Sequence, residues 1–296
     1  MRTLYLSPSG LAAYENCPRM YFYERVLRAR TVKASSNLGF GSAFASAMEA
    51  FLRAELEGKV IDAVKVFEHE WSAFTATHNV EYKKSLCRET LTRIGRALVS
   101  QLPTAWRRSG FSVVVDRFGK PMIERKLMTN IGNGVVLVTK LDLVVMDGEG
   151  QMFVIDAKTP ASPTTVTFTL MGDQLTAYQL AVQAHLEMLG LPPVEGVGYW
   201  EAIKRDVPKT GRGVGPVIQD PVIVDPRTDG DIEQFVKKVH SVADRIRAED
   251  FHKTPRMAWN SPCGGCPVAD ACARRDTTGL VFPSPAMEQV AMRMAA

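Results

Sequence analysis

Long apolar segments are missing from this 296-residue chain, in which no run of apolar residues exceeds four. A helix needs about 20 consecutive apolar residues to cross a bilayer, so we expect no membrane-spanning helix and no membrane partner. Residues 1–8 also lack the apolar core of a secretory signal. These absences predict a cytoplasmic protein, which would work in the host cytoplasm if the chain were viral.

Compositional bias is also absent. Gly (22 residues) and Pro (17 residues) are too few for a low-complexity or disordered chain, and apolar types make up 46% of the sequence. The length allows one large domain or two modest ones, each with a real core. We therefore expect a folded globular protein.

Excess charge is small overall, at a net +4, but it is unevenly placed. Residues 81–130 hold eleven Lys or Arg against four Asp or Glu, and residues 204–215 combine four basic residues with three glycines. The second segment is typical of a mobile basic loop. Both stretches favour a phosphate-rich partner, although a solvated helix face has the same composition.

Apolar spacing predicts helices towards both ends of the chain and strands between them. Ser7 and Asp173 are the expected N-caps of two of the helices. The expected helices cover 8–16, 18–26, 44–58, 91–102, 173–189 and 232–246, and the expected strands cover 111–115, 121–128, 135–146, 152–157 and 197–203. This order predicts an α+β or α/β domain with a small central sheet.

Two neighbouring strands carry both acids and lysines. Side chains alternate along a strand, so Lys140 shares a face with Asp142, and Asp156 shares a face with Lys158. A three-residue turn at Gly148 to Gly150 places Asp142 opposite Asp156 and Lys140 opposite Lys158. Facing side chains in an antiparallel pair are roughly 5 Å apart, and like charges at that distance are destabilising.

A cation between the two carboxylates would remove this repulsion. Two hard oxygen ligands on adjacent strands suit Mg²⁺ or Mn²⁺. Such a metal can generate a nucleophilic hydroxide and polarise a phosphoryl group, while Lys158 orients the attacking water or offsets charge on the phosphorane oxygens. The alternative from spacing alone is an exposed strand face with alternating polar residues.

The few cysteines are concentrated in one segment. Cys263, Cys266 and Cys272 lie within ten residues, and Cys17 lies near the other end of the chain. The fifth cysteine, Cys87, stands outside this pattern. In an intracellular chain this pattern favours a metal over disulfides and predicts that the two chain ends meet. Spacing alone leaves Zn²⁺ as the default occupant, with a [4Fe–4S] cluster or buried, inert thiols as alternatives.

The acids and lysine occur in an order that resembles the PD-(D/E)XK nucleases and, more narrowly, their RecB-type exonuclease branch. The resemblance implies that Asp142 and Asp156 bind the metal, that the Ala157 carbonyl completes its shell, and that Lys158 is the catalytic lysine. We place Lys140 among the residues that support the site or contact DNA. The implied fold is α/β, with a central mixed β-sheet flanked by helices in a restriction-endonuclease-like core.

Five further residues of this chain can be compared with positions that are typical of this branch or of the wider family. Gln174 and Tyr178, four apart on the next helix, match the motif that supports the site and the DNA strand. Ala45 stands where the branch usually has a histidine metal ligand, whereas Glu49, four residues on, matches the branch's usual acid and is a candidate further metal ligand. Glu124 stands where the family often has an acid on the preceding strand, and a surface role is its alternative.

The N-terminal segment carries a second resemblance. Residues 7–18 read Ser-Pro-Ser-Gly-Leu-Ala-Ala-Tyr-Glu-Asn-Cys-Pro. With the three C-terminal cysteines, this string resembles the iron–sulfur RecB-type nucleases, which include CRISPR-associated exonucleases and AddB-type subunits. The resemblance implies a [4Fe–4S] cluster that joins the N- and C-terminal segments around the nuclease core. Its ligands would be Cys17, Cys263, Cys266 and Cys272.

Together the resemblances imply a divalent-metal-dependent DNA exonuclease of recombination, repair or processing, acting on single-stranded or frayed ends. The alternative, motivated by Ala45, is a weakened or inactive nuclease fold that binds DNA or assembles with a recombination or CRISPR-adaptation partner. We leave a homo-oligomer open in both cases.

The expected organisation is one nuclease domain over residues 1–296. Residues 1–110 form its helical N-terminal part with Cys17, and residues 111–203 form the catalytic sheet and helix. Residues 204–296 supply the basic loop, the long helix and the C-terminal cysteines.

Overall fold

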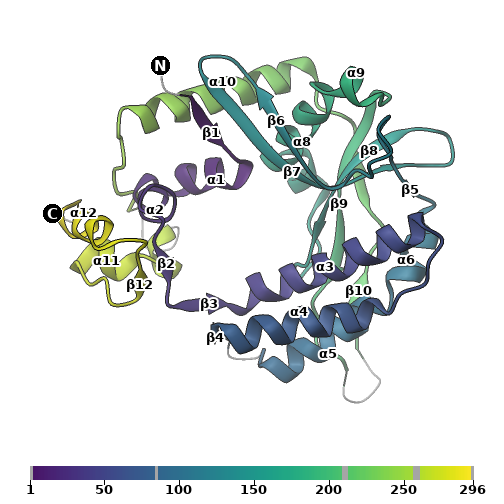
Figure 1. Cartoon of the computed structure of the whole chain (residues 1–296), viewed down its shortest axis with the longest axis horizontal. Coiled ribbons are helices and arrows are strands. Elements are labelled where there is room, and N and C mark those ends of the chain that lie inside the picture. Colours follow the sequence, from purple (N-terminus) through teal and green to yellow (C-terminus); the bar gives the residue numbers. More distant parts are fainter. Residues whose placement is uncertain (1–2, 84–85, 209–212, 256–260, 295–296) are drawn as a thin grey trace. The chain divides into compact units, whose positions relative to one another are not determined.

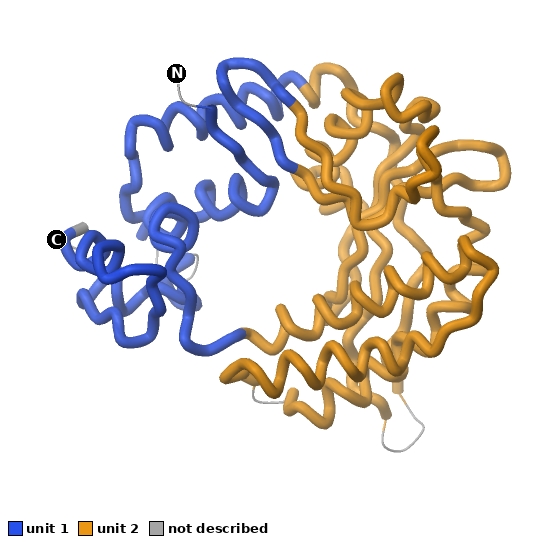
Figure 2. Tube along the Cα trace, viewed as in Figure 1, with its two compact units in different colours: residues 1–34, 130–138, 233–296 blue, residues 35–129, 139–232 orange. Residues whose placement is uncertain are grey.

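The computed structural model describes residues 3–83, 86–208, 213–255 and 261–294 (Figure 1). The chain divides into two compact units, each built from separate stretches of sequence (Figure 2). Unit 1 comprises residues 1–34, 130–138 and 233–296, and unit 2 comprises residues 35–129 and 139–232. Part of the predicted basic loop, residues 209–212, lies outside the described residues.

Unit 1 is mostly helical. Ser7 caps its first helix as predicted, because its Oγ accepts a hydrogen bond from the Gly10 N–H at 3.1 Å and Pro8 fills the first turn. Its elements are β1 (Leu4–Leu6), α1 (Pro8–Asn16), α2 (Pro18–Tyr21), the π-helical turn η1 (Phe22–Val26), β2 (Arg30–Thr31), most of α10 (Asp229–Arg247), η3 (Pro262–Gly265), α11 (Ala269–Arg274), β12 (Leu280–Val281) and α12 (Pro285–Met294). Strand β1, which the sequence did not predict, pairs in parallel with Val135 to Leu137.

The N- and C-terminal segments meet inside unit 1, as the cysteine positions predicted. Strand β12 pairs with β2 in antiparallel fashion. The Tyr14 hydroxyl donates a 2.6 Å hydrogen bond to the Asp250 carbonyl, and the rings of Phe22 and Phe251 are 5.0 Å apart. Tyr14 and Phe22 are buried. Aromatic packing therefore already joins segments that are far apart in sequence.

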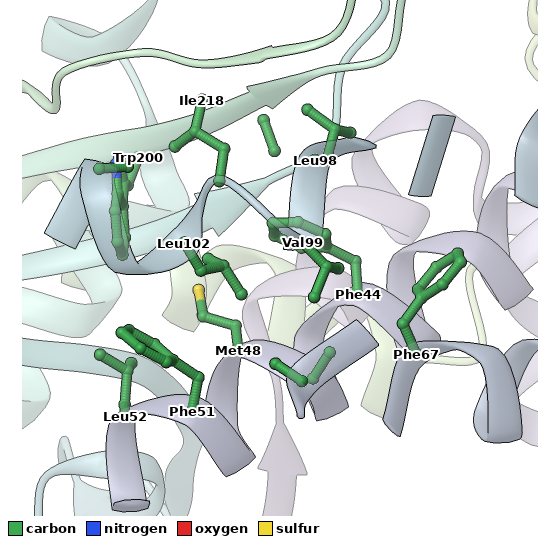
Figure 3. Close-up of a cluster of buried hydrophobic side chains, with 14 of the residues drawn as sticks. Phe44, Met48, Phe51, Leu52, Phe67, Leu98, Val99, Leu102, Trp200 and Ile218 are labelled. Atoms are coloured by element: carbon green, nitrogen blue, oxygen red, sulfur yellow. The ribbon is translucent and has the colours of Figure 1, made fainter. Parts of the chain in front are cut away.

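Unit 2 contains a helical layer and most of the sheet. Its helices pack around a core that includes Phe44, Met48, Leu98 and Trp200 (Figure 3). The helices of this layer are α3 (Ser36–Leu56), α4 (Ala63–Thr77), α5 (Arg88–Val99) and α6 (Leu102–Ser109). Within the described part of the chain, no helix combines the length and the apolar character needed to cross a membrane.

The sheet is mixed. Strand β7 is antiparallel to β8, β8 is parallel to β9, and both β10 and β11 are antiparallel to β9. The strands are β5 (Ser112–Val113), β6 (Ile123–Asn130), β7 (Val135–Met146), β8 (Met152–Lys158), β9 (Val194–Ile203), β10 (Val217–Ile218) and β11 (Val222–Val224). Two short strands, β3 (Lys33–Ser35) and β4 (Asn79–Glu81), form a separate two-stranded sheet. The β7–β8 pairs Leu143↔Ile155 and Met146↔Met152 confirm the register predicted from the three-residue turn.

Alternate residues of β8 enter two different cores. Phe153 and Ile155 pack on the α3 side, whereas Val154 packs on the other side against α8 (Asp173–Gln183). The protein is therefore a mixed α/β fold with a central mixed sheet flanked by helices. Asp156 has the parity of Val154, so it belongs to the α8 face.

The helix predicted over 173–189 is two helices, α8 and α9 (Leu186–Leu189), preceded by a short α7 (Val166–Leu170) that was not predicted. Asp173 is not the cap. Gly172 is the N-cap, and Asp173 lies in the first turn, where a carboxylate still interacts favourably with the helix dipole. A Cβ added to Gly172 would lie 2.8 Å from the Tyr199 hydroxyl, so this close approach favours glycine.

Candidate active site

Two aspartates from adjacent strands lie side by side in unit 2. Asp142 adjoins Leu143, which forms the last regular β7–β8 pair with Ile155. Its Oδ2 accepts a 2.9 Å hydrogen bond from the Ala157 N–H. Asp156, at the end of β8, is fully buried at 0% exposure. The hairpin thus brings the two predicted metal-binding acids together.

Burial and mutual repulsion disfavour the charged forms of both carboxyl groups. Burial and, next, the charge of Asp156 together raise the pKa of Asp142 to about 7, against the opposing effect of Lys158. Burial also raises the pKa of Asp156, and Lys158 again lowers it. Two buried carboxylates need a proton or a cation beside them, and a divalent cation serves this purpose.

Lys158 stands next to the acids. Its Nζ lies 2.5 Å from Oδ2 of Asp156, and its side chain is 41% exposed. The ammonium of Lys158 is therefore the partner of the buried Oδ2 of Asp156. A carboxylate oxygen is the kind of ligand that Mg²⁺ or Mn²⁺ prefers. The chemistry of this donor set therefore fits such an ion.

Helix α8 holds the other oxygen of Asp156. Gln174 donates from Nε2 to Asp156 Oδ1 at 2.8 Å and to the Tyr178 hydroxyl at 2.8 Å. The Tyr178 hydroxyl in turn hydrogen-bonds to Asp156. Burial raises the pKa of Tyr178, which keeps the phenol protonated as a donor. The four-residue spacing places both side chains on one helical face, as predicted.

Glu124 joins the acids from β6. Its side chain is 14% exposed and forms an ion pair with Lys140, and its charge contributes to the raised pKa of Asp142. Lys140 therefore pairs with an acid on β6, whereas the sequence analysis placed it only relative to the strand that carries Lys158. The φ of Glu124 is +51°, and a left-handed conformation costs a non-glycine residue about 1–3 kcal/mol.

Helix α3 passes the end of β8 without a metal-binding side chain at Ala45. A Cβ added to Gly41 would lie 3.7 Å from Thr159 Oγ1, directly after Lys158, and Ala45 is one turn further on. Glu49 is held by Arg53, whose Nη2 lies 2.8 Å from Glu49 Oε1. The Glu49 charge helps to raise the pKa of Lys140 after the hydrogen bond and charge of Glu124, so Glu49 acts on the edge of the site.

The four predicted cluster cysteines all lie in unit 1. Cys17 is buried between α1 and α2, Cys263 and Cys266 lie at η3, and Cys272 is on α11. Burial raises the pKa of Cys266, and Cys17, Cys272 and Cys263 add to this effect, so the four thiols are within electrostatic reach of one another. Cys87 is exposed in unit 2.

The described residues contain no group of three or more His, Cys, Asp or Glu side chains arranged to hold a metal ion. This applies both to the cysteines and to the acids. The structure brings each set together, and the donor types fit thiophilic and oxygen-preferring metals respectively, but neither set has a closed coordination geometry.

Part of the basic stretch 81–130 is engaged by acids. Four of its arginines form ion pairs, namely Arg93 with Asp206, Arg96 with Glu68, Arg108 with Asp220, and Arg125 with Asp116. Most of these contacts are exposed and contribute little to stability. They do reduce the positive charge that this stretch presents, so a high local count of Lys and Arg overstated its availability to a partner.

One buried acid near the site was missed by the sequence reasoning. Glu201 is 1% exposed, lies opposite Lys158 in the β8–β9 register, and accepts a 3.0 Å hydrogen bond from the Thr164 N–H. It fixes the segment that follows β8. The available signal was an acid inside the apolar segment 194–203.

Comparisons with known proteins identify the family. A solved structure described as the crystal structure of SSO0001 aligns with 88% of this chain and 82% of its own, at 11% identity and a TM-score of 0.38. Among proteins with curated descriptions, none matches. The family model of the PD-(D/E)XK nuclease superfamily matches residues 5–273. With nearly the whole chain covered, this protein belongs to the PD-(D/E)XK nuclease superfamily.

Proposed function

We propose that the protein is a divalent-metal-dependent DNA exonuclease that hydrolyses phosphodiester bonds at DNA ends, with a cytoplasmic role in recombination, repair or processing. Membership of a nuclease superfamily supports the reaction class. The observation that carries the proposal is the buried pair Asp142 and Asp156, whose carboxyl pKa values are raised beside the Lys158 ammonium.

Each side chain has a separate task in this proposal. Asp142, Asp156 and the Ala157 carbonyl would hold Mg²⁺ or Mn²⁺, which supplies an activated water and polarises the phosphoryl group. Lys158 offsets the negative charge that develops on the phosphoryl oxygens. Gln174 and Tyr178 keep Asp156 oriented by binding its oxygens.

The test uses linear DNA labelled at either end, and covalently closed circular DNA, with Mg²⁺ or Mn²⁺. We expect Asp156→Ala and Lys158→Ala each to lower the cleavage rate of linear DNA by at least about 10²-fold, because each removes a group that acts at the reacting phosphate. Glu149→Ala, at the exposed turn of the same hairpin, is the matched control. Undiminished digestion by both site variants would remove the assignment, and equal cutting of circular DNA would exclude an exonuclease.

A second candidate is a weakened or inactive nuclease fold that binds DNA ends or assembles with a recombination or CRISPR-adaptation partner. Ala45, which supplies no metal ligand, and the engagement of Glu49 by Arg53 favour it. No cleavage with any divalent metal, together with tight and salt-sensitive DNA binding by the wild-type chain, would support this candidate instead.

We further propose that Cys17, Cys263, Cys266 and Cys272 hold a [4Fe–4S] cluster in unit 1. The mutual electrostatic effect of the four thiols and the pairing of β2 with β12 support the proposal. Anaerobically purified protein should be brown and contain iron and sulfide in near-equal amounts. A colourless protein that contains zinc would replace the cluster with a Cys₄ zinc site.

A further inference from the structure

A cleft of about 740 Å³ opens beside the candidate active site and lies within unit 2. Lys158 and Gln174 line one part of it. The rest of its lining includes Phe168, Lys204 and Lys83, none of which takes part in holding the two aspartates. Any DNA strand whose phosphodiester reaches Asp142 and Asp156 has this cleft next to it.

Lys204 places a poorly compensated positive charge in the cleft. Its Nζ donates a 3.0 Å hydrogen bond to Asn37 Oδ1 and lies 5.2 Å from the centre of the Phe40 ring. Both partners are neutral. Burial and, to a smaller extent, the charge of Lys83 lower the pKa of Lys204 to about 8. A half-buried ammonium that is repelled by a second lysine is stabilised by an anion.

Phe168 places an aromatic face at the same cleft. Its side chain is 57% exposed, although it is a large apolar group, and its ring lies 5.8 Å from that of Tyr199. Exposed aromatic rings beside basic groups are the usual binding platform for unpaired bases. Bases inside a duplex cannot present a face to such a ring without leaving the stack.

The segment that carries Phe168 is held in place. The Thr165 hydroxyl accepts a hydrogen bond from the Phe168 N–H at 3.2 Å. Arg227, which is 9% exposed, donates from Nη2 to the Thr169 carbonyl at 2.6 Å. Glu201, which also lines the cleft, is buried and accepts a hydrogen bond from the Thr164 N–H, so its carboxylate is held by the segment that leads to Phe168. The ring is therefore a positioned group, and a positioned ring loses little entropy on binding a base.

We propose that this cleft binds one unpaired nucleotide of a DNA strand next to the phosphodiester at Asp142 and Asp156, with Phe168 stacking on its base and Lys204 contacting its phosphate. The inference rests on the proposed function and specifies its substrate as a strand with unpaired bases at the site. Lys83, which also lines the cleft, adds positive charge for the phosphate.

Binding of metal-free wild-type protein to single-stranded oligonucleotides tests the stacking. Oligonucleotides carry the fluorescent base 2-aminopurine at successive positions from one end, and its emission changes on stacking. We expect a change confined to one position, loss of that change in Phe168→Leu with about tenfold weaker binding, and its return in Phe168→Trp. Phe118→Leu, at another exposed phenylalanine of unit 2, should bind like the wild type.

The salt dependence of the same binding tests Lys204. A lysine that contacts a phosphate of a single strand contributes about 0.7 to the slope of log affinity against log salt, so Lys204→Met should lower the slope by about that amount. Lys204→Arg should preserve the slope, and Lys59→Met, at an exposed lysine paired with Glu57, should not change it.

These outcomes separate the two proposals. If the wild type cleaves DNA but neither Phe168→Leu nor Lys204→Met alters binding, the cleft is not a nucleotide site and the nuclease assignment stands. If no cleavage occurs while the position-specific emission change persists and depends on Phe168, the cleft is a nucleotide site on a protein that is not an active exonuclease.

Discussion

At the scale of single residues, Asp142 is a carboxyl group whose charged form is disfavoured by the folded protein. In the unfolded chain an aspartate has a pKa of about 3.9, whereas burial and the neighbouring Asp156 raise the pKa of Asp142 to about 7 in the folded protein. Between these two values the folded state binds more protons than the unfolded state. The free energy of unfolding contributed by Asp142 therefore falls as the pH rises from about 4 to about 7 and stays low above that.

Asp142→Asn removes this penalty. We expect the metal-free variant to be more stable than the wild type at pH 8, on the order of 2 kcal/mol, and similar to it near pH 4, where both side chains are neutral. Mg²⁺ should stabilise the wild type but not the variant, because only the carboxylate binds the cation. Urea denaturation with and without chelator measures all three effects. Glu149→Gln is the control, and a variant less stable than the wild type at pH 8 without metal would contradict the reasoning.

At the scale of elements, two glycines of the helical layer are predicted to respond oppositely to the same substitution. A Cβ added to Gly95 of α5 would lie 1.9 Å from the Phe67 ring of α4, whereas a Cβ added to Gly41 of α3 would lie 3.7 Å from Thr159 Oγ1. We expect Gly95→Ala to destabilise unit 2 by about 1–3 kcal/mol through overpacking. Gly41→Ala should stabilise it by about 0.5–1 kcal/mol, because alanine is the better helix former.

Chemical denaturation of the two alanine variants measures this difference directly. The pair controls for the substitution itself, since both change glycine to alanine inside a helix. A Gly95→Ala protein as stable as Gly41→Ala would show that Phe67 moves aside without loss, and the close packing of α4 on α5 would not limit stability.

Elements with strong local signals were predictable, whereas those that depend on neighbours were not. The Ser7 cap, the strand 135–146 and the turn at Gly148 to Gly150 follow from local rules, and the structure has them at the predicted places. Strand β1 has three residues and exists only because it pairs with β7. Helix α7 has five residues, and Arg227 ties it in place from 58 positions away in the sequence.

At the scale of the whole molecule, the two proposed metal sites fall in different units. All four cluster cysteines belong to unit 1, whereas Asp142, Asp156 and Lys158 belong to unit 2 (Figure 2). Unit 1 is assembled from segments at both ends of the sequence, so a link between Cys17 and the C-terminal cysteines closes a very long loop. Links of this kind reduce the entropy of the unfolded chain most.

Cys17→Ser should therefore act on unit 1 alone. We expect loss of the visible absorption and a fall of about 3–5 kcal/mol in the stability of unit 1, with the unfolding of unit 2 unchanged. Anaerobic calorimetry combined with limited proteolysis assigns each transition to its unit. Cys87→Ser, at an exposed thiol of unit 2, provides the comparison and should alter neither property. Retention of the absorption and of both transitions in Cys17→Ser would exclude Cys17 as a ligand.

The sequence by itself determined the β7–β8 register, the facing of Asp142 and Asp156, the α8 side chains that share a face, and the meeting of the chain ends. The first three follow from short-range rules, namely turn length, strand alternation and helical spacing, and the last follows from cysteines placed near both ends of the chain. Only the tertiary structure decided that Lys140 pairs with Glu124, that Gly41 of α3 lies beside Thr159, and that Phe168 and Lys204 share a cleft. These contacts join segments from different elements, and their distances depend on how whole faces pack, which no local pattern encodes.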